Sequence, residues 1–307
     1  MKAIKRYLSG LAALCAFHTM AVPTFTPLVD FGANPGELTA SYYKAKADAE
    51  ATVVLLHGCT QEGQQFAIDS GFLALAKQHN FNLLVPQQSS KNNIQGCFNW
   101  FSPQDTSKDS GELLSLKNMM LASAPAGDQQ FYIVGLSAGG AMASAFIHHY
   151  ADLVTGGAIV AGIPYPCADN LTKAIACMRH GPNPQQSALT KPANASINSA
   201  KQTLPRLSVW AGADDRVVNP KNARAITQQW LGETDQMLTY QAENKAGYKH
   251  TRWHNQSDVM LELIELEGGG HGFFIDQQQA REKTNPYILT ANVSASQHII
   301  AFWHLNK

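Results

Sequence analysis

A serine between two glycines lies where an apolar run meets a run of small residues. Residues Phe131 to Val134 favour a strand and lead into Gly135-Leu-Ser137-Ala-Gly139, after which small residues open a helix. A G-x-S-x-G sequence between a strand and a helix is typical of a nucleophile elbow, a strained turn that exposes the serine hydroxyl. Flanking glycines avoid a Cβ clash with the neighbouring chain. The pattern predicts a nucleophilic serine, although the pentapeptide alone fits an ordinary glycine-rich turn equally well.

A candidate acid follows another strand-like run further along the chain. Leu207 to Trp210 predict a buried strand, Gly212 begins a turn, and Asp214 and Asp215 follow. In a nucleophilic triad the acid holds the imidazole in the correct tautomer and stabilises the imidazolium. Aspartates in such loops most often serve as turn or helix-capping residues. The residues themselves leave open which aspartate is the acid.

A candidate base follows a third strand-like run. The alternating stretch Leu261 to Leu266 ends in three glycines and His271, and the glycines leave the imidazole free to reach another loop. The chain order serine, acid, histidine is that of the α/β-hydrolases. Among the other ten histidines only His57 has a comparable setting, and it suits another role.

His57 begins a candidate oxyanion loop. A nearly continuous apolar run, 52–56, leads into His57-Gly-Cys59. In α/β-hydrolases the loop after an early strand donates one oxyanion N–H, and the residue after the nucleophile donates the other. Here these donors are the backbone amides of Cys59 and Ala138, each contributing about 3 kcal/mol of transition-state stabilisation. This chemistry requires no metal or organic cofactor, and no Cys/His or His/carboxylate group has the sequence spacing of a metal site.

The elements that must position these residues alternate along the chain. We expect strands near 38–43, 52–56, 82–85, 131–135, 157–161, 206–210 and 259–266. We expect helices near 66–79, 109–123, 138–150, 221–231 and 292–305. Such alternation predicts an α/β-hydrolase fold, with a mostly parallel central sheet covered by helices on both faces.

Composition and the N-terminus indicate a compact, exported protein. The chain has 307 residues, 45% of them apolar and 15% charged, with a formal net charge of zero. This excludes a basic nucleic-acid footprint, and no run has the features of a membrane anchor. Residues 1–21 combine a basic start, a short apolar run and small residues before a cleavage point, which predicts a signal peptide. We expect one catalytic domain over 22–307, in the periplasm or outside the cell.

Cleavage would leave four cysteines in the mature chain, namely Cys59, Cys97, Cys167 and Cys177. An even number of cysteines in an exported chain predicts two disulfides, for which the residues alone leave three pairings open.

Together these segments resemble the secreted poly(3-hydroxybutyrate) depolymerase family of α/β-hydrolase esterases, which is related to feruloyl and acetyl-xylan esterases. The stretches that carry the resemblance run in the family's order and cover most of the mature chain. They are Leu56-His-Gly-Cys-Thr-Gln61, Cys97-Phe-Asn-Trp-Phe101, Gly135-Leu-Ser-Ala-Gly-Gly-Ala-Met142, Ala161-Gly-Ile-Pro-Tyr-Pro-Cys167, Cys177-Met178, Ala211-Gly-Ala-Asp-Asp215 and Gly270-His271.

The resemblance implies further roles. The family's acid lies in a His-Gly-x-x-Asp-x-x-Val pattern, which selects Asp215, although Ala211 replaces the usual histidine. It also implies that Trp100 lines the site and contacts the acyl chain, while Phe98 stands where relatives usually carry tryptophan. The disulfide pairing it favours, with the short separation, is Cys167–Cys177, which leaves Cys59–Cys97.

Residues 177–205 are rich in Asn, Gln, Ser, Ala and Pro, which fits a lid over the site or a solvated surface excursion equally well. Because the chain ends after one more helix, we expect no separate polymer-binding domain.

The function expected from the sequence is hydrolysis of 3-hydroxyalkanoate polyester or oligoester substrates. A feruloyl or acetyl-xylan esterase would use the same residues and is the alternative. A binding protein that retains the fold is a third hypothesis, which the complete set of Ser137, Asp215 and His271 argues against. Oligomeric state leaves no signal in the sequence.

Overall fold

The computed structural model describes residues 24–46, 48–124, 129–183, 204–234, 237–256, 258–280 and 285–306. The predicted signal peptide, 1–21, lies outside these residues. So does most of the 177–205 segment, of which only its first and last residues are described.

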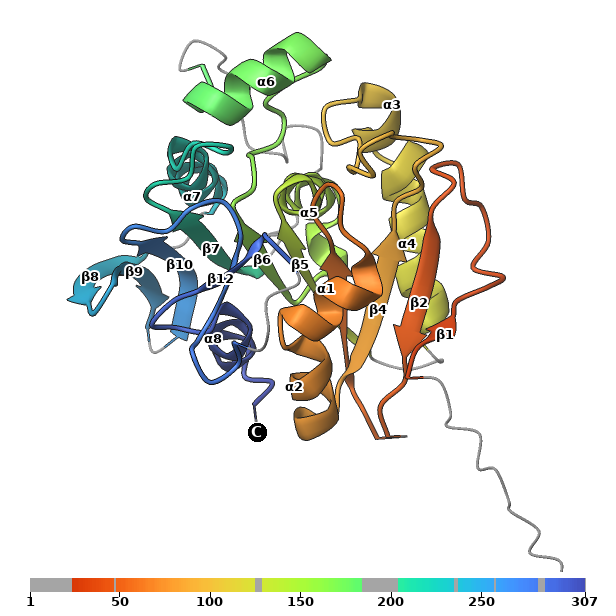
Figure 1. The fold of residues 1–307 in the computed structure, drawn as a ribbon, viewed down its shortest axis with the longest axis horizontal. Coiled ribbons are helices and arrows are strands. Elements are labelled where there is room, and N and C mark those ends of the chain that lie inside the picture. Colours follow the sequence, from red (N-terminus) through yellow and green to blue (C-terminus); the bar gives the residue numbers. More distant parts are fainter. Residues whose placement is uncertain are drawn as a thin grey trace, which may run out of the picture.

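A ten-stranded sheet runs through the molecule in the order β1-β2-β4-β3-β5-β6-β7-β10-β9-β8 (Figure 1). The six strands from β4 to β10 in this order are parallel, and antiparallel strands flank them on both sides. The strands are β1 (Thr26–Pro27), β2 (Thr39–Tyr43), β3 (Ala51–Leu56), β4 (Asn82–Gln87), β5 (Gln130–Leu136), β6 (Gly156–Val160), β7 (Arg206–Gly212), β8 (Thr239–Lys245), β9 (Tyr248–Asn255) and β10 (Asp258–Leu266). Two short parallel strands, β11 (Phe273–Ile275) and β12 (Ile288–Thr290), form a separate ribbon.

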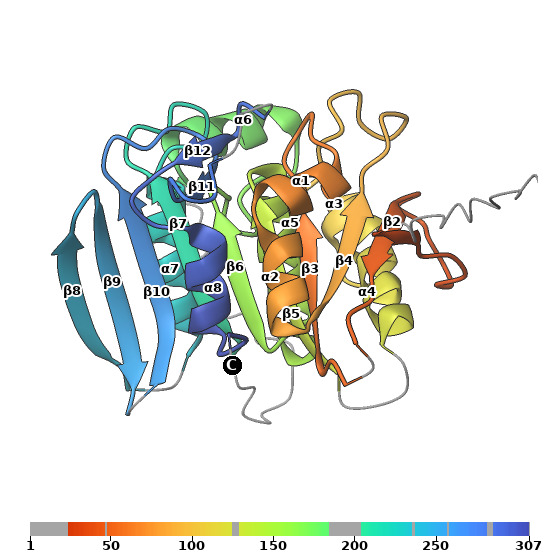
Figure 2. The ribbon, with the colours of Figure 1, turned by 60° about the horizontal axis from the view of Figure 1, so that its bottom comes forward.

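Helices cover both faces of the sheet. They are α1 (Gly63–Asp69), α2 (Phe72–His79), α3 (Pro103–Thr106), α4 (Gly111–Ser123), α5 (Ala138–His149), α6 (Leu171–His180), α7 (Lys221–Glu233) and α8 (Ala295–Phe302). Helices α1, α2 and α8 lie on one face and α4, α5 and α7 on the other, while α6 lies beyond the ends of the parallel strands (Figure 2). This confirms the predicted α/β-hydrolase fold.

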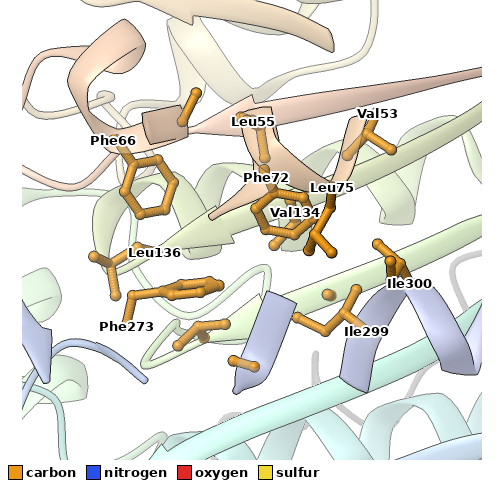
Figure 3. Packing of buried hydrophobic residues seen from close by; sticks show 14 of the residues in the cluster. Val53, Leu55, Phe66, Phe72, Leu75, Val134, Leu136, Phe273, Ile299 and Ile300 are labelled. Carbon is orange, nitrogen blue, oxygen red and sulfur yellow. The ribbon is translucent and has the colours of Figure 1, made fainter. Parts of the chain in front are cut away.

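Strand periodicity explains why the sheet has two apolar faces. Successive side chains of a strand point to opposite faces, so Val53 and Leu55 enter one core while Val54 and Leu56 enter the other. The first core packs Phe66 and other side chains of α1, α2 and α8 against the sheet (Figure 3). The central strands, buried on both faces, are therefore mainly apolar, as the sequence predicted.

The structure departs from the expected elements in several places: it divides one expected helix, and it contains elements that were not expected, namely β1, β8, β9, β11, β12, α3 and α6. The expected helix over 66–79 is two helices, because the chain turns at Gly71 with a φ of +84°. Strand β8 was not predicted, since its mostly exposed residues have no apolar alternation. Helix α6 was also not predicted, because most of its residues are polar or exposed.

Candidate active site

Ser137 lies in a strained turn between β5 and α5. Its φ of 56° and ψ of −118° are rare for a residue with a side chain. Its N–H donates to the carbonyl of Val160 at 2.9 Å, which ties the turn to strand β6. A Cβ on Gly135 would clash with the backbone of Gly139, and a Cβ on Gly139 would clash with the carbonyl of Leu56. Both glycines are thus required by close backbone packing.

His271 joins Ser137 to Asp215 through two hydrogen bonds. Its Nε2 lies 2.9 Å from Ser137 Oγ, and its Nδ1 lies 2.8 Å from Asp215 Oδ2. Both side chains of the His271–Asp215 pair are almost fully buried. With Nδ1–H donating to the carboxylate, Nε2 is the lone-pair nitrogen that can accept the serine proton. The arrangement can therefore generate a nucleophile.

The carboxylate of Asp215 is held in place by its own loop. Its Oδ1 accepts hydrogen bonds from the backbone N–H groups of Val217 and Val218, both at 2.8 Å. The other oxygen is thereby left for His271. Asp214, by contrast, is exposed, and its N–H donates to the carbonyl of Gly269. Of the two aspartates that the sequence left open, the structure brings Asp215 to the imidazole.

The acid and base loops approach each other backbone to backbone. A Cβ on Gly212, at the end of β7, would overlap the backbone of Gly269 in the loop after β10. A Cβ on Gly272 would lie 2.6 Å from the carbonyl of Tyr287. The glycines near His271 therefore serve close loop packing as well as imidazole placement.

The loop after β3 contains one backbone amide that has no acceptor among the described residues. The N–H of Gly58 donates to Gln61 Oε1 at 2.7 Å, and that of Thr60 to the carbonyl of Gln95. Between them, the N–H of Cys59 donates to no acceptor within the described residues. The N–H of Ala138, in the first turn of α5, has no intrahelical acceptor by geometry. Both amides are thus available for a developing oxyanion.

The buried side chain of His57 is hydrogen-bonded to the backbone of this loop. The side chain is fully buried, and burial lowers its pKa to about 4, so the imidazole is neutral at neutral pH. Its Nε2 accepts from the N–H of Gln88 at 3.2 Å, so Nδ1 carries the proton and donates to the carbonyl of Gly58 at 2.8 Å. That carbonyl belongs to the same peptide unit as the Cys59 N–H. His57 therefore restricts the direction in which this amide points.

Trp100 lies half-buried beside a small apolar cluster next to the Ser137 helix. The buried members of the cluster are Ala141, Ile163, Cys167, Cys177 and Val218, and Met178 packs against it. Phe98 is fully buried against the ring of His57, at 5.0 Å between ring centroids. Phe98 is thus a core residue, whereas Trp100 lies between the core and the surface.

The structure joins Cys59 to Cys97 and Cys167 to Cys177, the pairing that the resemblance favoured. The first disulfide connects the loop after β3 to the segment that carries Trp100. The second links α6 to the loop that follows β6.

One buried acidic side chain close to the segment of Trp100 escaped the sequence analysis. Glu112, in the first turn of α4, hydrogen-bonds both to Gln88 and to Asn99. An acidic residue near a helix start usually interacts with the helix dipole, so nothing local marked Glu112 as different.

Elsewhere in the described residues, three groups that could hold a metal ion converge. They are His250, Glu262 and His298, whose ligand atoms lie within 4.8 Å of one another. Sequence spacing missed them because they come from β9, β10 and α8. Here both imidazoles hydrogen-bond to the same carboxylate oxygen, at 2.8 and 3.0 Å, and so offset the buried charge. None of the helices in the described ranges combines the length and apolar character needed to cross a bilayer.

Comparison with known proteins places these features in context. The family model described as esterase PHB depolymerase matches residues 40–252. A poly(3-hydroxyalkanoate) depolymerase C of Paucimonas lemoignei is 32% identical over 97% of this chain and 74% of its own length. A feruloyl esterase B of Talaromyces stipitatus is 23% identical, over 82% of this chain and 73% of the relative. The solved acetyl xylan esterase from Aspergillus awamori shares the fold, with a TM-score of 0.70 and 20% identity over 92% of this chain and all of that one.

Proposed function

The chain belongs to the esterase PHB depolymerase family and is a carboxylic-ester hydrolase, and we propose that it is an exported serine esterase that cleaves 3-hydroxyalkanoate oligoesters or polyesters. The observation that carries the catalytic part is the hydrogen-bonded series from Ser137 through His271 to Asp215. A nucleophile, a base and an orienting acid in this geometry are the requirements for acyl transfer through a covalent intermediate.

The proposed reaction begins when Ser137 Oγ attacks the ester carbonyl and His271 Nε2 takes its proton. The backbone amides of Cys59 and Ala138 stabilise the oxyanion, and His271 then protonates the leaving alcohol. His271 next activates a water molecule that hydrolyses the acyl-enzyme. Asp215 holds the imidazole and stabilises its protonated form throughout.

The substrate proposal combines the relatives with the wall of the site. The relative with 32% identity is a poly(3-hydroxyalkanoate) depolymerase, whereas the feruloyl esterase is 23% identical. Trp100, with Met178 and Val218 nearby, offers an apolar surface on which a short aliphatic acyl chain can pack. A feruloyl or acetyl-xylan substrate remains the second candidate, supported by the more distant relatives.

Export is supported by the cysteines. The structure contains two disulfides, and disulfides form and persist chiefly in oxidising compartments. We propose cleavage of residues 1–21 and one catalytic domain over 22–307, which N-terminal sequencing of the secreted protein would test.

The test of the proposed function is hydrolysis of the 3-hydroxybutyrate trimer by the mature protein and by Ser137→Ala. Removing the nucleophile should lower kcat on the order of a millionfold. Feruloyl and acetyl sugar esters, assayed in parallel, would measure the alternative. Loss of trimer hydrolysis in the variant supports the proposal, whereas activity only on the sugar esters would favour the second candidate.

A fluorophosphonate probe separates an enzyme from a binding protein with the same fold. The wild type should be labelled at Ser137, and Ser137→Ala should not be. An unlabelled wild type that still binds oligoester would overturn the catalytic proposal.

A further inference from the structure

We propose that Glu112 is a positioning residue, which holds Asn99 and thereby sets Trp100 at the wall of the acyl-binding site. This inference rests on the proposed function, since it concerns how the same site receives its substrate. Glu112 touches neither the reacting atoms nor the oxyanion amides. It acts through the segment that carries Trp100 and through the support of the oxyanion loop.

The carboxylate of Glu112 grips Asn99 at two points. Its Oε2 accepts from the backbone N–H of Asn99 at 2.9 Å, and its Oε1 accepts from the side-chain amide of Asn99 at 2.7 Å. Asn99 is the residue immediately before Trp100. Because one carboxylate binds both the backbone and the side chain of Asn99, it restricts the backbone conformation immediately before Trp100.

The same carboxylate reaches the oxyanion loop through Gln88. Glu112 Oε1 accepts from Gln88 Nε2 at 2.5 Å, and the N–H of Gln88 donates to His57. His57 in turn fixes the peptide between Gly58 and Cys59. One buried side chain thus connects the two walls of the site, which the Cys59–Cys97 disulfide also joins covalently.

Glu112 is buried, so its carboxylate depends on these hydrogen bonds to replace contacts with water. The side chain is fully buried, with the backbone of Gly36 packed so closely that a Cβ there would lie 2.6 Å from the Glu112 Cα. The pKa of Glu112 is raised to about 7, chiefly by burial and also by the nearby charge of Asp105, while the hydrogen bonds from Asn99 and Gln88 act in the opposite direction. All three facing groups are N–H donors, so the ionised carboxylate suits them better than the protonated acid. The start of α4 also favours the negative form.

Trp100 needs such an anchor because its other contacts are apolar and non-directional. Its ring packs against the cluster around Cys167 and Cys177 and meets Phe101 edge-on at 5.5 Å. Apolar packing alone allows a half-exposed ring to tilt. The two hydrogen bonds to Asn99 supply the direction that the packing lacks.

The first experiment uses Glu112→Gln in the mature protein. If the amide oxygen takes the Oε1 position, the bonds from Gln88 and the Asn99 side chain remain. The amide nitrogen then faces the Asn99 N–H, so that a donor meets a donor and this bond is lost. Backbone amide exchange over residues 97–101 should become faster, and KM for the 3-hydroxybutyrate trimer should rise about tenfold, as expected for losing one bond to a charged group. The kcat for p-nitrophenyl acetate, which is too short to need Trp100, should stay within about threefold.

Glu262→Gln is the matched control. Glu262 is also a buried glutamate with several donors, among them Ser208 and His250, but it lies on β10 away from both loops. A purely structural effect of removing a buried carboxylate would appear in both variants. We expect Glu262→Gln to leave the exchange of residues 97–101 and the trimer KM unchanged.

A second variant, Asn99→Ala, tests the same contact from the other side. It removes the amide that donates to Glu112, so it should raise the trimer KM as well. Because the two residues act as one unit, the double variant should raise KM by less than the product of the two single effects. Should Glu112→Gln not fold, Asn99→Ala still decides whether the contact sets KM.

The inference is overturned if residues 97–101 exchange no faster in Glu112→Gln, or if exchange rises without any change in the trimer KM. Independent, multiplying effects of Glu112→Gln and Asn99→Ala would also contradict it. The exchange measurement needs no substrate, so it judges Glu112 even if the trimer is not hydrolysed. Failure of the proposed function would instead appear as a wild type without trimer activity or Ser137 labelling.

Discussion

At the residue scale, hydrogen bonds restrict the side chains of the site to one orientation or one tautomer. One carboxylate oxygen of Asp215 accepts hydrogen bonds from two backbone N–H groups, and the other oxygen accepts from His271. His57 is held as the neutral Nδ1–H tautomer by a donor on one side and an acceptor on the other. Ser137 is strained by its own backbone. Such preorganisation avoids rearrangement during the reaction.

The two neighbouring aspartates provide a direct test. Asp215→Asn should lower kcat on the order of 10⁴-fold, because an amide in place of the carboxylate can hold the wrong imidazole tautomer. Asp214→Asn is the matched control, since this side chain is exposed and is expected to leave kcat within about threefold. Steady-state kinetics on the trimer measure both. A large loss in Asp214→Asn with an active Asp215→Asn would reverse the assignment.

At the element scale, polar groups and disulfides fix how neighbouring elements meet. Glu262 on β10 accepts hydrogen bonds from Ser208 on β7, His250 on β9 and His298 on α8. These bonds join β10 to both neighbouring strands and to α8, so the cluster holds this part of the sheet and its helical cover together. One disulfide joins two loops, and the other joins a loop to helix α6.

The Glu262 cluster should make stability depend on acid pH. Burial alone would raise the pKa of Glu262, but hydrogen bonds from His250 and His298 lower it from 4.5 to about 2. The unfolded carboxyl binds its proton at higher pH than the folded one. The cluster therefore contributes about 3 kcal/mol above pH 4.5, which is lost as the pH falls through 2.

Urea unfolding of wild type and Glu262→Gln between pH 3 and 7 measures this contribution. The gap in free energy of unfolding should be widest above pH 4.5 and should narrow toward pH 3. A gap that does not change with pH would show that the ionised carboxylate is not the stabilising form. The raised pKa of Glu112 has the opposite sign, so its ionisation lowers stability as the pH rises from 4.5 to about 7.

The two disulfides should differ in both stability and activity. Cys59–Cys97 spans 38 residues and Cys167–Cys177 spans 10, so loop-closure entropy predicts losses of about 4 and about 3 kcal/mol respectively. Double serine variants at each pair, unfolded in urea, compare these values. Trimer kcat/KM should fall more without Cys59–Cys97, because that bridge joins the oxyanion loop to the Trp100 segment. Equal activity of the two variants would argue against this role.

At the scale of the whole molecule, one sheet is shared by two apolar cores. Each central strand sends alternate side chains into both cores, as Val53 and Val54 do in β3. Neither core can therefore unfold while the other stays folded, because both are built on the same strands. The site lies where loops from most of the parallel strands meet, beyond the strand ends.

This sharing predicts a single cooperative unfolding transition, as the proposed single domain requires. Denaturant curves followed by far-ultraviolet circular dichroism and by tryptophan fluorescence should coincide. Trp210 in β7 and Trp303 after α8 report on the sheet and on its helical cover. Two separate transitions would contradict the single-domain proposal.

The sequence by itself determined the features that depend on local backbone chemistry. A glycine-flanked serine after an apolar strand, a histidine after three glycines and alternating strands and helices were sufficient for the fold and for the class of enzyme. Gly135, for example, is required by its close packing against the backbone of Gly139 within the same turn.

Only the tertiary structure decided which distant side chains meet. Ser137 and His271 are 134 residues apart, and their contact depends on the order of β5, β7 and β10 in the sheet. The residues alone could not choose between Asp214 and Asp215, because a shift of one position in a loop leaves the pattern unchanged. The support from His57, the grip of Glu112 on Asn99 and the Glu262 cluster left no local pattern, since each forms only when separate elements pack together.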